Sequence, residues 1–176
     1  MHLALDLEEL LLDVNQISAL PKALGAWSKL RVFSAAENEI TELPADVGEW
    51  RESVFINLRN NKLKELPNEV GQWVKLERLY LGCNQLTSLP EEIGKLTNLQ
   101  RLLLHENNLT SLPAEIGKLT KLKELILDWR KMKTLPAEIQ GLTSLTALSL
   151  RNSNLISLPE GFGGFTSLEK LDLSSN

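Results

Sequence analysis

The hydrophobic positions along this chain recur with a period of 23 residues. In Leu76–Asn98 the apolar residues begin as LxxLxLxxN, and the alternation at Leu79 and Leu81 is typical of a half-buried strand. The later apolar residues are more widely spaced, with Pro90 ahead of them and Gly94 among them, which predicts a short helical or 3₁₀ turn. One such unit cannot bury its own apolar side, so the pattern predicts stacked units that share a continuous core.

The same spacing extends over the whole chain. With the first leucine of each predicted strand counted as position 1, units begin at residues 7, 30, 53, 76, 99, 122, 145 and 168. Proline occupies position 15 of seven units: Pro21, Pro44, Pro67, Pro90, Pro113, Pro136 and Pro159. No linker interrupts the units, so we expect one elongated domain over residues 1–176. Both ends fall inside a unit and show no polar cap, which predicts weak end-to-end self-association.

Asparagine recurs at position 9, where the predicted strand ends and the chain turns inward. Such a turn leaves buried backbone groups that a short amide side chain can satisfy. We therefore predict a structural ladder of hydrogen-bonded amides along the core. Its members are Asn15, Asn38, Asn61, Asn84 and Asn107.

The repeated motif LxxLxLxxNxLxxLPxxIGxLxx makes the chain resemble the leucine-rich repeat family. The resemblance covers the whole chain and is closest to the 23-residue intracellular class, which includes Ras-group repeat proteins, Roco GTPases and Scribble-like scaffolds. It implies an α/β leucine-rich-repeat solenoid, curved as a right-handed superhelix. A parallel sheet would line the concave face, with short helical or 3₁₀ turns on the convex face.

Positions 3, 5 and 7 of each unit are predicted to point out from the concave sheet, and position 8 lies at its rim. These positions differ from unit to unit, so we expect them to determine partner choice. The central units carry aromatic, aliphatic and arginine residues there, the composition of interface hot spots. The predicted partner-binding residues are Phe55, Arg59, Arg78, Tyr80, Arg101, Leu103, His105, Ile126, Asp128 and Trp129. Scattered apolar surface residues are the alternative interpretation. In the binding hypothesis, Arg78 and Arg101 pair with acidic groups of the partner.

The unit at residues 122–144 breaks the template most. Arg130 stands where asparagine is expected, and Gln140 replaces the turn glycine. A buried unpaired arginine is costly, so the loop around Trp129–Lys131 is predicted to leave the regular path. Such a departure indicates either a functional loop or drift in a tolerant one.

Three tryptophans share position 21, where leucine stands in other units. They are Trp27, Trp50 and Trp73. We predict that they fill the core, with each ring stacked near the next.

The amino-acid composition reduces the number of functional classes to consider. With 43% hydrophobic and 24% charged residues the chain has a soluble globular composition, and its net charge of −4 gives no reason to expect nucleic acid. No apolar run is long enough for a membrane span, and the first residues lack the features of a leader. A single cysteine, Cys83, excludes an internal disulfide framework and suits the cytoplasm. Two histidines far apart in the sequence do not suggest a metal site, and no cofactor is expected.

The predicted function is a protein-protein interaction module that binds a partner protein through the concave face, without chemistry of its own. The alternative is the repeat arm of a larger signalling protein, such as a Roco-type GTPase or kinase. Catalysis is a third reading, because Cys83, His105 and Asp128 lie in adjacent units. An open sheet excludes no water and offers no evident oxyanion donors, so we do not expect an enzyme.

Overall fold

The computed structural model describes residues 6–128 and 131–176, which form one open parallel sheet of eight strands with a 3₁₀ helix after each of the first seven. The strands are β1 (Glu9–Leu11), β2 (Val32–Ser34), β3 (Phe55–Asn57), β4 (Arg78–Tyr80), β5 (Arg101–Leu103), β6 (Glu124–Ile126), β7 (Ala147–Ser149) and β8 (Lys170–Asp172). The helices are η1 (Lys22–Ala26), η2 (Ala45–Glu49), η3 (Asn68–Gln72), η4 (Glu91–Lys95), η5 (Ala114–Lys118), η6 (Ala137–Gly141) and η7 (Phe162–Gly164). Each strand pairs with the next one in sequence, so that Leu79 lies beside Leu102, 23 residues later. The predicted fold class is confirmed.

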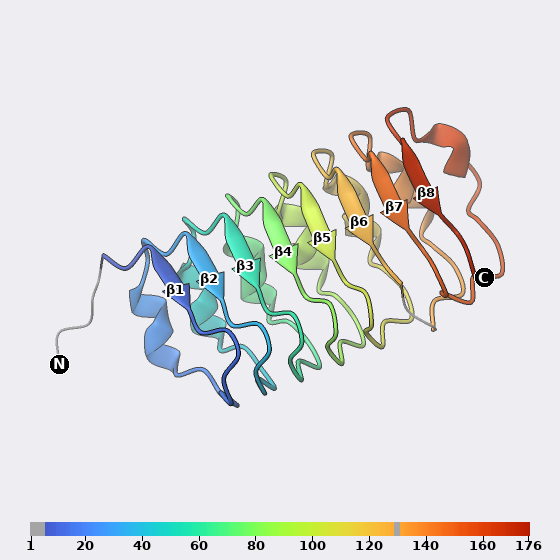
Figure 1. Ribbon diagram of the computed structural model, residues 1–176. Coiled ribbons are helices and arrows are strands. Elements are labelled where there is room, and N and C mark those ends of the chain that lie inside the picture. The colour runs from blue at the N-terminus through green and yellow to red at the C-terminus, as the bar shows by residue number, and fades with distance from the viewer. Residues whose placement is uncertain (1–5, 129–130) are drawn as a thin grey trace.

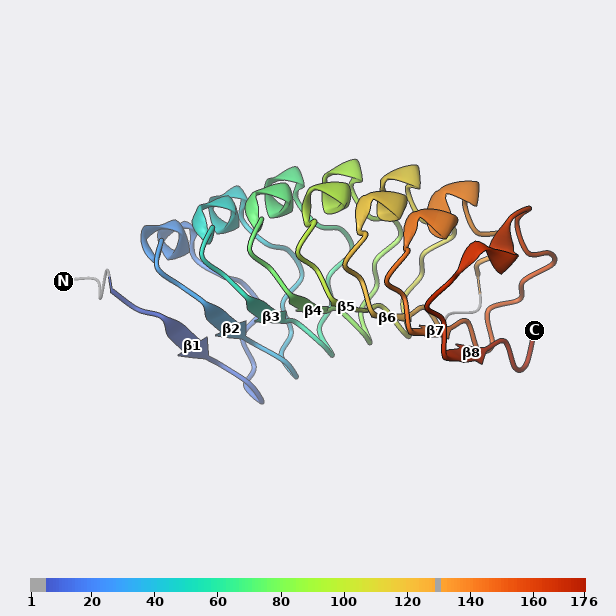
Figure 2. The ribbon, with the colours of Figure 1, turned by 90° about the horizontal axis from the view of Figure 1, so that it is seen from above.

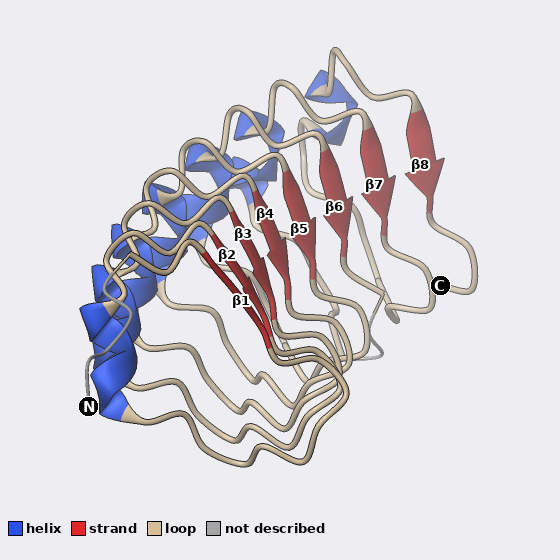
Figure 3. Cartoon of the chain, turned by 60° about the vertical axis from the view of Figure 1, so that its left-hand side comes forward, coloured by secondary structure: helices blue, strands red, loops and turns tan. Residues whose placement is uncertain are grey.

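The strands lie side by side along the length of the molecule (Figure 1). The helices follow the opposite face (Figure 3). Seen from above, the row of strands bows toward the helices at its middle, so the sheet forms the concave side (Figure 2). Each coil therefore presents its strand to the concave surface and its helix to the convex surface.

The core runs through the coils as stacked layers of apolar side chains. Leu79 and Leu81, at positions 4 and 6, have no exposed surface. The rings of Trp50 and Trp73 are stacked, with centroids 6.4 Å apart and planes 11° apart. Trp27 is only half-buried. The indoles of Trp50 and Trp73 also hold neighbouring coils together, since Nε1 of Trp50 donates to the carbonyl of Leu24 at 2.9 Å and Nε1 of Trp73 donates to that of Val47 at 2.7 Å.

Each of the first six helices begins after a proline and spans five residues. Proline suits this place because it has no N–H to leave unsatisfied, and its fixed φ favours a helix start. A glycine at position 19 then lets neighbouring helices approach. A Cβ atom added to Gly94 would lie 2.7 Å from both Cβ and the carbonyl oxygen of Glu115 in the next coil. The repeated glycine is therefore a close-contact residue between coils.

The asparagines at position 9 connect each coil to the one before it. Nδ2 of Asn84 donates to the carbonyls of Leu58 at 2.9 Å and Leu81 at 3.0 Å. Its Oδ1 accepts the N–H of Leu63 at 3.0 Å. Equivalent bonds are made by Asn38, Asn61 and Asn107. Asn15 differs, because it is exposed and, within the described part of the chain, its side chain donates to carbonyls of its own coil, those of Leu12 and Asp13.

Position 8 has a backbone constraint that the sequence analysis missed. The described residues at this position have φ between 54° and 61°: Val14, Glu37, Asn60, Cys83, Glu106, Asn152 and Ser175. This left-handed conformation favours glycine and asparagine and is costly for a β-branched residue such as Val14. Position 8 is therefore not free to vary for a partner alone, because each side chain there must tolerate this turn.

The predicted irregular loop includes Trp129 and Arg130, which lie outside the described residues. The effect of Gln140 can be followed in the next coil. Gln140 faces Gly161, which has a φ of 82° and stands where earlier coils have an acidic residue. At the usual contact a glycine of one coil faces a larger residue of the next, whereas here the larger residue, Gln140, comes first and the glycine, Gly161, comes second. The helix that follows Gly161, η7, is only three residues long.

Candidate protein-binding surface

The middle of the concave face carries a partly exposed apolar group that we call the central patch, formed by Phe55, Tyr80, Leu103 and Ile126. The rings of Phe55 and Tyr80 meet edge to face, with centroids 5.1 Å apart. Strand pairing places Leu103 between Tyr80 and Ile126. The sequence-predicted apolar residues of β3 to β6 therefore lie together, while Trp129 is outside the described residues.

Two arginines border the central patch, and both already have contacts within the chain. The Arg78 guanidinium lies over the Phe55 ring, 4.6 Å from its centroid. Arg101 Nε lies 3.4 Å from Glu124 Oε2, and the pKa of Arg101 is raised, first by the Tyr80 hydroxyl and then by Glu124. A partner carboxylate would have to compete with Glu124 for Arg101, whereas Arg78 keeps its charge exposed beside an aromatic ring.

The edge of the central patch near position 7 is formed by His105 lying over Gly82. A Cβ atom added to Gly82 would come within 2.2 Å of the His105 ring. A larger residue at this position would displace the imidazole from the space that it occupies. Arg59 is exposed in the preceding coil, and its guanidinium acts to lower the pKa of the neighbouring Cys83 thiol.

The geometry does not assemble the three residues considered for catalysis. Burial, the largest cause, raises the pKa of Cys83, and Glu106, whose Oε2 lies 3.7 Å from Sγ, adds to the rise while Arg59 opposes it. A raised pKa leaves less thiolate, the reactive form. The Asp128 carboxylate is bonded to the following coil, not to His105: its Oδ1 accepts from the Ser149 hydroxyl at 2.6 Å and from the Arg151 N–H at 2.9 Å.

The Asp128 contact was not anticipated, and it has a counterpart at the other end of the concave face. Asp13 Oδ1 accepts from the Ser34 hydroxyl and from the Ala36 N–H, each at 2.6 Å. Asn57 extends this flank by donating to Ser34 Oγ at 3.1 Å. The sequence does contain the signal, since both pairs are an aspartate and a serine 21 residues apart. Asp128, which we predicted to bind a partner, is already used by the chain itself.

A hollow of about 530 Å³ lies beside the central patch, over β6, β7 and β8. All three residues of the middle strand, β7 (Ala147–Ser149), contribute to its lining. Side chains of the two adjacent strands line it, including Glu124 and Ile126 of β6 and Lys170 and Asp172 of β8. The apolar surface thus continues into a depression with charged walls.

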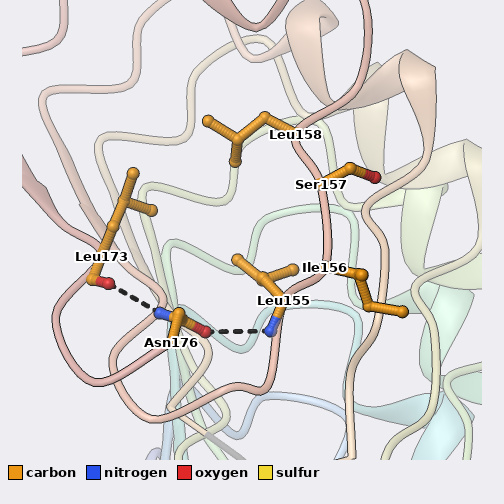
Figure 4. Close-up of a pocket in the computed structure, with 6 residues that line it drawn as sticks. All are labelled: Leu155, Ile156, Ser157, Leu158, Leu173 and Asn176. Atoms are coloured by element: carbon orange, nitrogen blue, oxygen red, sulfur yellow. Dashed lines mark hydrogen bonds between the residues drawn. The ribbon is translucent and has the colours of Figure 1, made fainter.

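A second cavity, of about 170 Å³, lies at the C-terminal end of the described coils and is mostly apolar (Figure 4). Asn176 closes one side, where Nδ2 donates to the Leu173 carbonyl and Oδ1 accepts the Leu155 N–H. The amide thus has the same function here as the asparagines of earlier coils. The other labelled lining residues are Ile156, Ser157 and Leu158.

A metal site and a membrane-spanning segment have less support than a protein-binding surface. Within residues 6–128 and 131–176 no group of three potential metal-ligating side chains comes together. The helices in the same part of the chain are too short to cross a bilayer.

Each coil has one strand and one 3₁₀ helix, and a column of asparagines joins the coils under a parallel concave sheet. These features define a leucine-rich-repeat solenoid. The family model described as "Leucine-rich repeat region" matches residues 4–108 and 54–125. The chain belongs to the leucine-rich repeat family. The intracellular subclass suggested by the 23-residue motif stays a prediction.

Solved structures of leucine-rich repeat proteins share this fold. A leucine-rich repeat protein of Leptospira interrogans is 30% identical with a TM-score of 0.70, and the match covers 97% of this chain and 55% of that one. A plant peptide hormone receptor, RGFR1 in complex with RGF2, is 34% identical with a TM-score of 0.85, covering 97% of this chain and 28% of the receptor.

The ectodomain of the Arabidopsis thaliana receptor kinase GASSHO1/SCHENGEN3, in complex with CASPARIAN STRIP INTEGRITY FACTOR 2, is 30% identical with a TM-score of 0.68. That match covers 97% of this chain and 24% of the ectodomain. This chain therefore spans only part of the length of the structures it matches. No curated protein sequence matches it significantly.

Proposed function

We propose that this chain is an interaction module that binds a partner polypeptide through the central patch of its concave face, with no chemistry of its own. One observation supports this most directly. Towards each end of the concave face an aspartate is bonded to a serine of the next coil, whereas the central patch is apolar and partly exposed. Apolar and aromatic groups gathered on a rigid sheet bind with little loss of conformational entropy.

The comparisons support the kind of partner. Two similar structures are receptors solved in complexes, one of them named as a peptide hormone receptor. The same comparisons leave room for the second candidate function, a repeat arm within a larger signalling protein, since the chain covers 55% or less of the three chains described above. Both functions require binding through the concave face. We keep the cytoplasm as the proposed location, on the basis of the free Cys83.

The test combines affinity capture with titration of the purified captured partner. Tyr80→Ala with Leu103→Ala should weaken binding by about 2 kcal/mol, or roughly thirtyfold, because these side chains form the middle of the central patch. The free energy of unfolding should fall by less than about 2 kcal/mol, since both side chains are already partly exposed.

The matched control is Val74→Ala, which shortens an aliphatic side chain that is 47% exposed at position 22, outside the strands. It should leave the affinity unchanged. If the double variant binds as tightly as the unmodified chain, the proposed function is wrong.

A further inference from the structure

We infer that the hollow over Ala147 seats a lysine or arginine side chain of the polypeptide that lies on the central patch. This inference rests on the proposed function, and it specifies the chemistry of the partner. It concerns β6, β7 and β8, which are neighbours in the sheet (Figure 1).

The shape of the hollow follows from the size of one side chain. Strand pairing places Ala147 between Glu124 and Lys170 in the row formed by position 3. Ala147 is the smallest residue of that row, whose other members are Glu9, Val32, Phe55, Arg78, Arg101, Glu124 and Lys170. Because an alanine is flanked by two long side chains, space for an incoming side chain remains above it.

The charge of the walls selects the occupant. Three carboxylates line the hollow, those of Glu124, Glu169 and Asp172, against the single ammonium group of Lys170. Arg101 already pairs with Glu124 from outside the lining, which leaves Glu169 and Asp172 as the carboxylates for an incoming cation. Two hydrogen bonds from Ser174, donated by its hydroxyl and its N–H, hold the pKa of Asp172 below its usual range. The negative excess favours a cationic side chain over an anionic one.

The apolar part of the lining suits the stem of the same side chain. Ile126 belongs to both the central patch and the hollow, and Ala147, Leu148 and Leu171 also line the hollow. Lysine and arginine bury their aliphatic stems against such surface while their charged ends stay near carboxylates and water. A purely aliphatic side chain would instead cover charged groups without pairing them, which is unfavourable.

The strand register also predicts the spacing within the partner. Ser149 is three strands from Tyr80 in the row formed by position 5. With about 4.8 Å between strands, this distance is about 14 Å. An extended polypeptide advances about 3.3 Å per residue, so about four residues cover this distance, and residues four apart point to the same side. The basic residue should therefore lie about four residues from an aromatic or aliphatic anchor.

The test selects binders from a random peptide library displayed on phage, using the unmodified 176-residue chain, and measures the affinities of the recovered peptides by fluorescence anisotropy. We expect enrichment of peptides with lysine or arginine about four residues from an apolar anchor. Ala147→Leu fills the hollow and should weaken these peptides about tenfold. Ala137→Leu makes the same change at an exposed residue of η6 and should have no effect.

A second comparison isolates the charge. Replacing the basic residue of a selected peptide by glutamine should weaken its binding to the unmodified chain, and should cause no further loss in Ala147→Leu. Thermal unfolding of both variants identifies any loss of the fold.

The outcomes separate the two proposals. Selected peptides that depend on Tyr80 but lack a basic residue, or that bind Ala147→Leu as well as Ala137→Leu, would overturn this inference and leave the proposed function standing. Failure to recover any peptide that depends on Tyr80 would overturn both.

Discussion

The interior coils and the end coils use the same repeat positions differently. In the interior, Asn84 joins its coil to the preceding one, and Gly94 makes room for Glu115 of the following one. In the first coil the amide of Asn15 contacts only its own backbone, and in the last complete coil Gly163 has no atom within 4 Å of an added Cβ. The asparagine depends on the coil before it, and the glycine depends on the coil after it.

The contact between η6 and η7 supports this interpretation. Every earlier contact of this kind pairs a glycine with an acidic residue of the next coil, whereas here Gln140 faces Gly161. Since one member stays small, the total volume at the contact is roughly kept. The residues repeated at these two positions are therefore explained by the contact between neighbouring coils, and less by the conformation of any single coil.

The largest effect expected from this comparison concerns the amide column. Asn84→Ala removes the donor to the carbonyls of Leu58, Leu81 and Gly82 and leaves the buried Leu63 N–H without its acceptor. Since buried unpaired groups are costly, we expect the free energy of unfolding to fall by about 3 kcal/mol in urea titrations followed by circular dichroism. Asn15→Ala, at the same repeat position, should cost less than about 1 kcal/mol because that amide is exposed. Equal losses would show that the asparagine acts within its own coil.

A smaller effect is expected at the glycines. Gly94→Ala would place a methyl group 2.7 Å from Glu115, and such overpacking costs about 1 to 3 kcal/mol. Gly163→Ala meets open space and should be neutral or stabilising by up to about 1 kcal/mol, because alanine favours a helical backbone. Thermal unfolding of the two variants is the measurement, and a destabilised Gly163→Ala would contradict the contact explanation.

The smallest effect is expected at position 8, where interior and end coils share one backbone conformation. Val14 and Asn60 have φ of 57° and 56°, and both are exposed. Val14→Asn should stabilise the chain by about 1 kcal/mol, and Asn60→Val should destabilise it by a similar amount, since asparagine tolerates this region and valine does not. Chemical unfolding of both variants tests the prediction. Changes of the same sign in both would mean that side-chain contacts, not the backbone, dominate at this position.

Much of the fold could be predicted from the sequence because one period sets everything that the backbone repeats. The place of one strand in each unit, the buried leucines and the stacking of Trp50 on Trp73 all follow from equal residues lying beside each other in successive coils. The central patch was predicted for the same reason. Each strand begins two residues after the predicted first position of its unit. The predicted role of Asp128 considered its side chain alone and missed the Ser149 hydroxyl, which reaches it from the next coil at the same spacing as Ser34 from Asp13.

By itself, then, the sequence determined the period, the register, the buried positions and the residues that share the concave face. The tertiary structure decided which of those residues still have free groups: Arg101 is paired with Glu124, His105 covers Gly82, and the flanking aspartates hold serines. It also decided that position 8 is left-handed and that a hollow opens over Ala147. The physical reason is that a repeat fixes distances between backbones, whereas contacts between side chains depend on their length, direction and size, which differ from coil to coil.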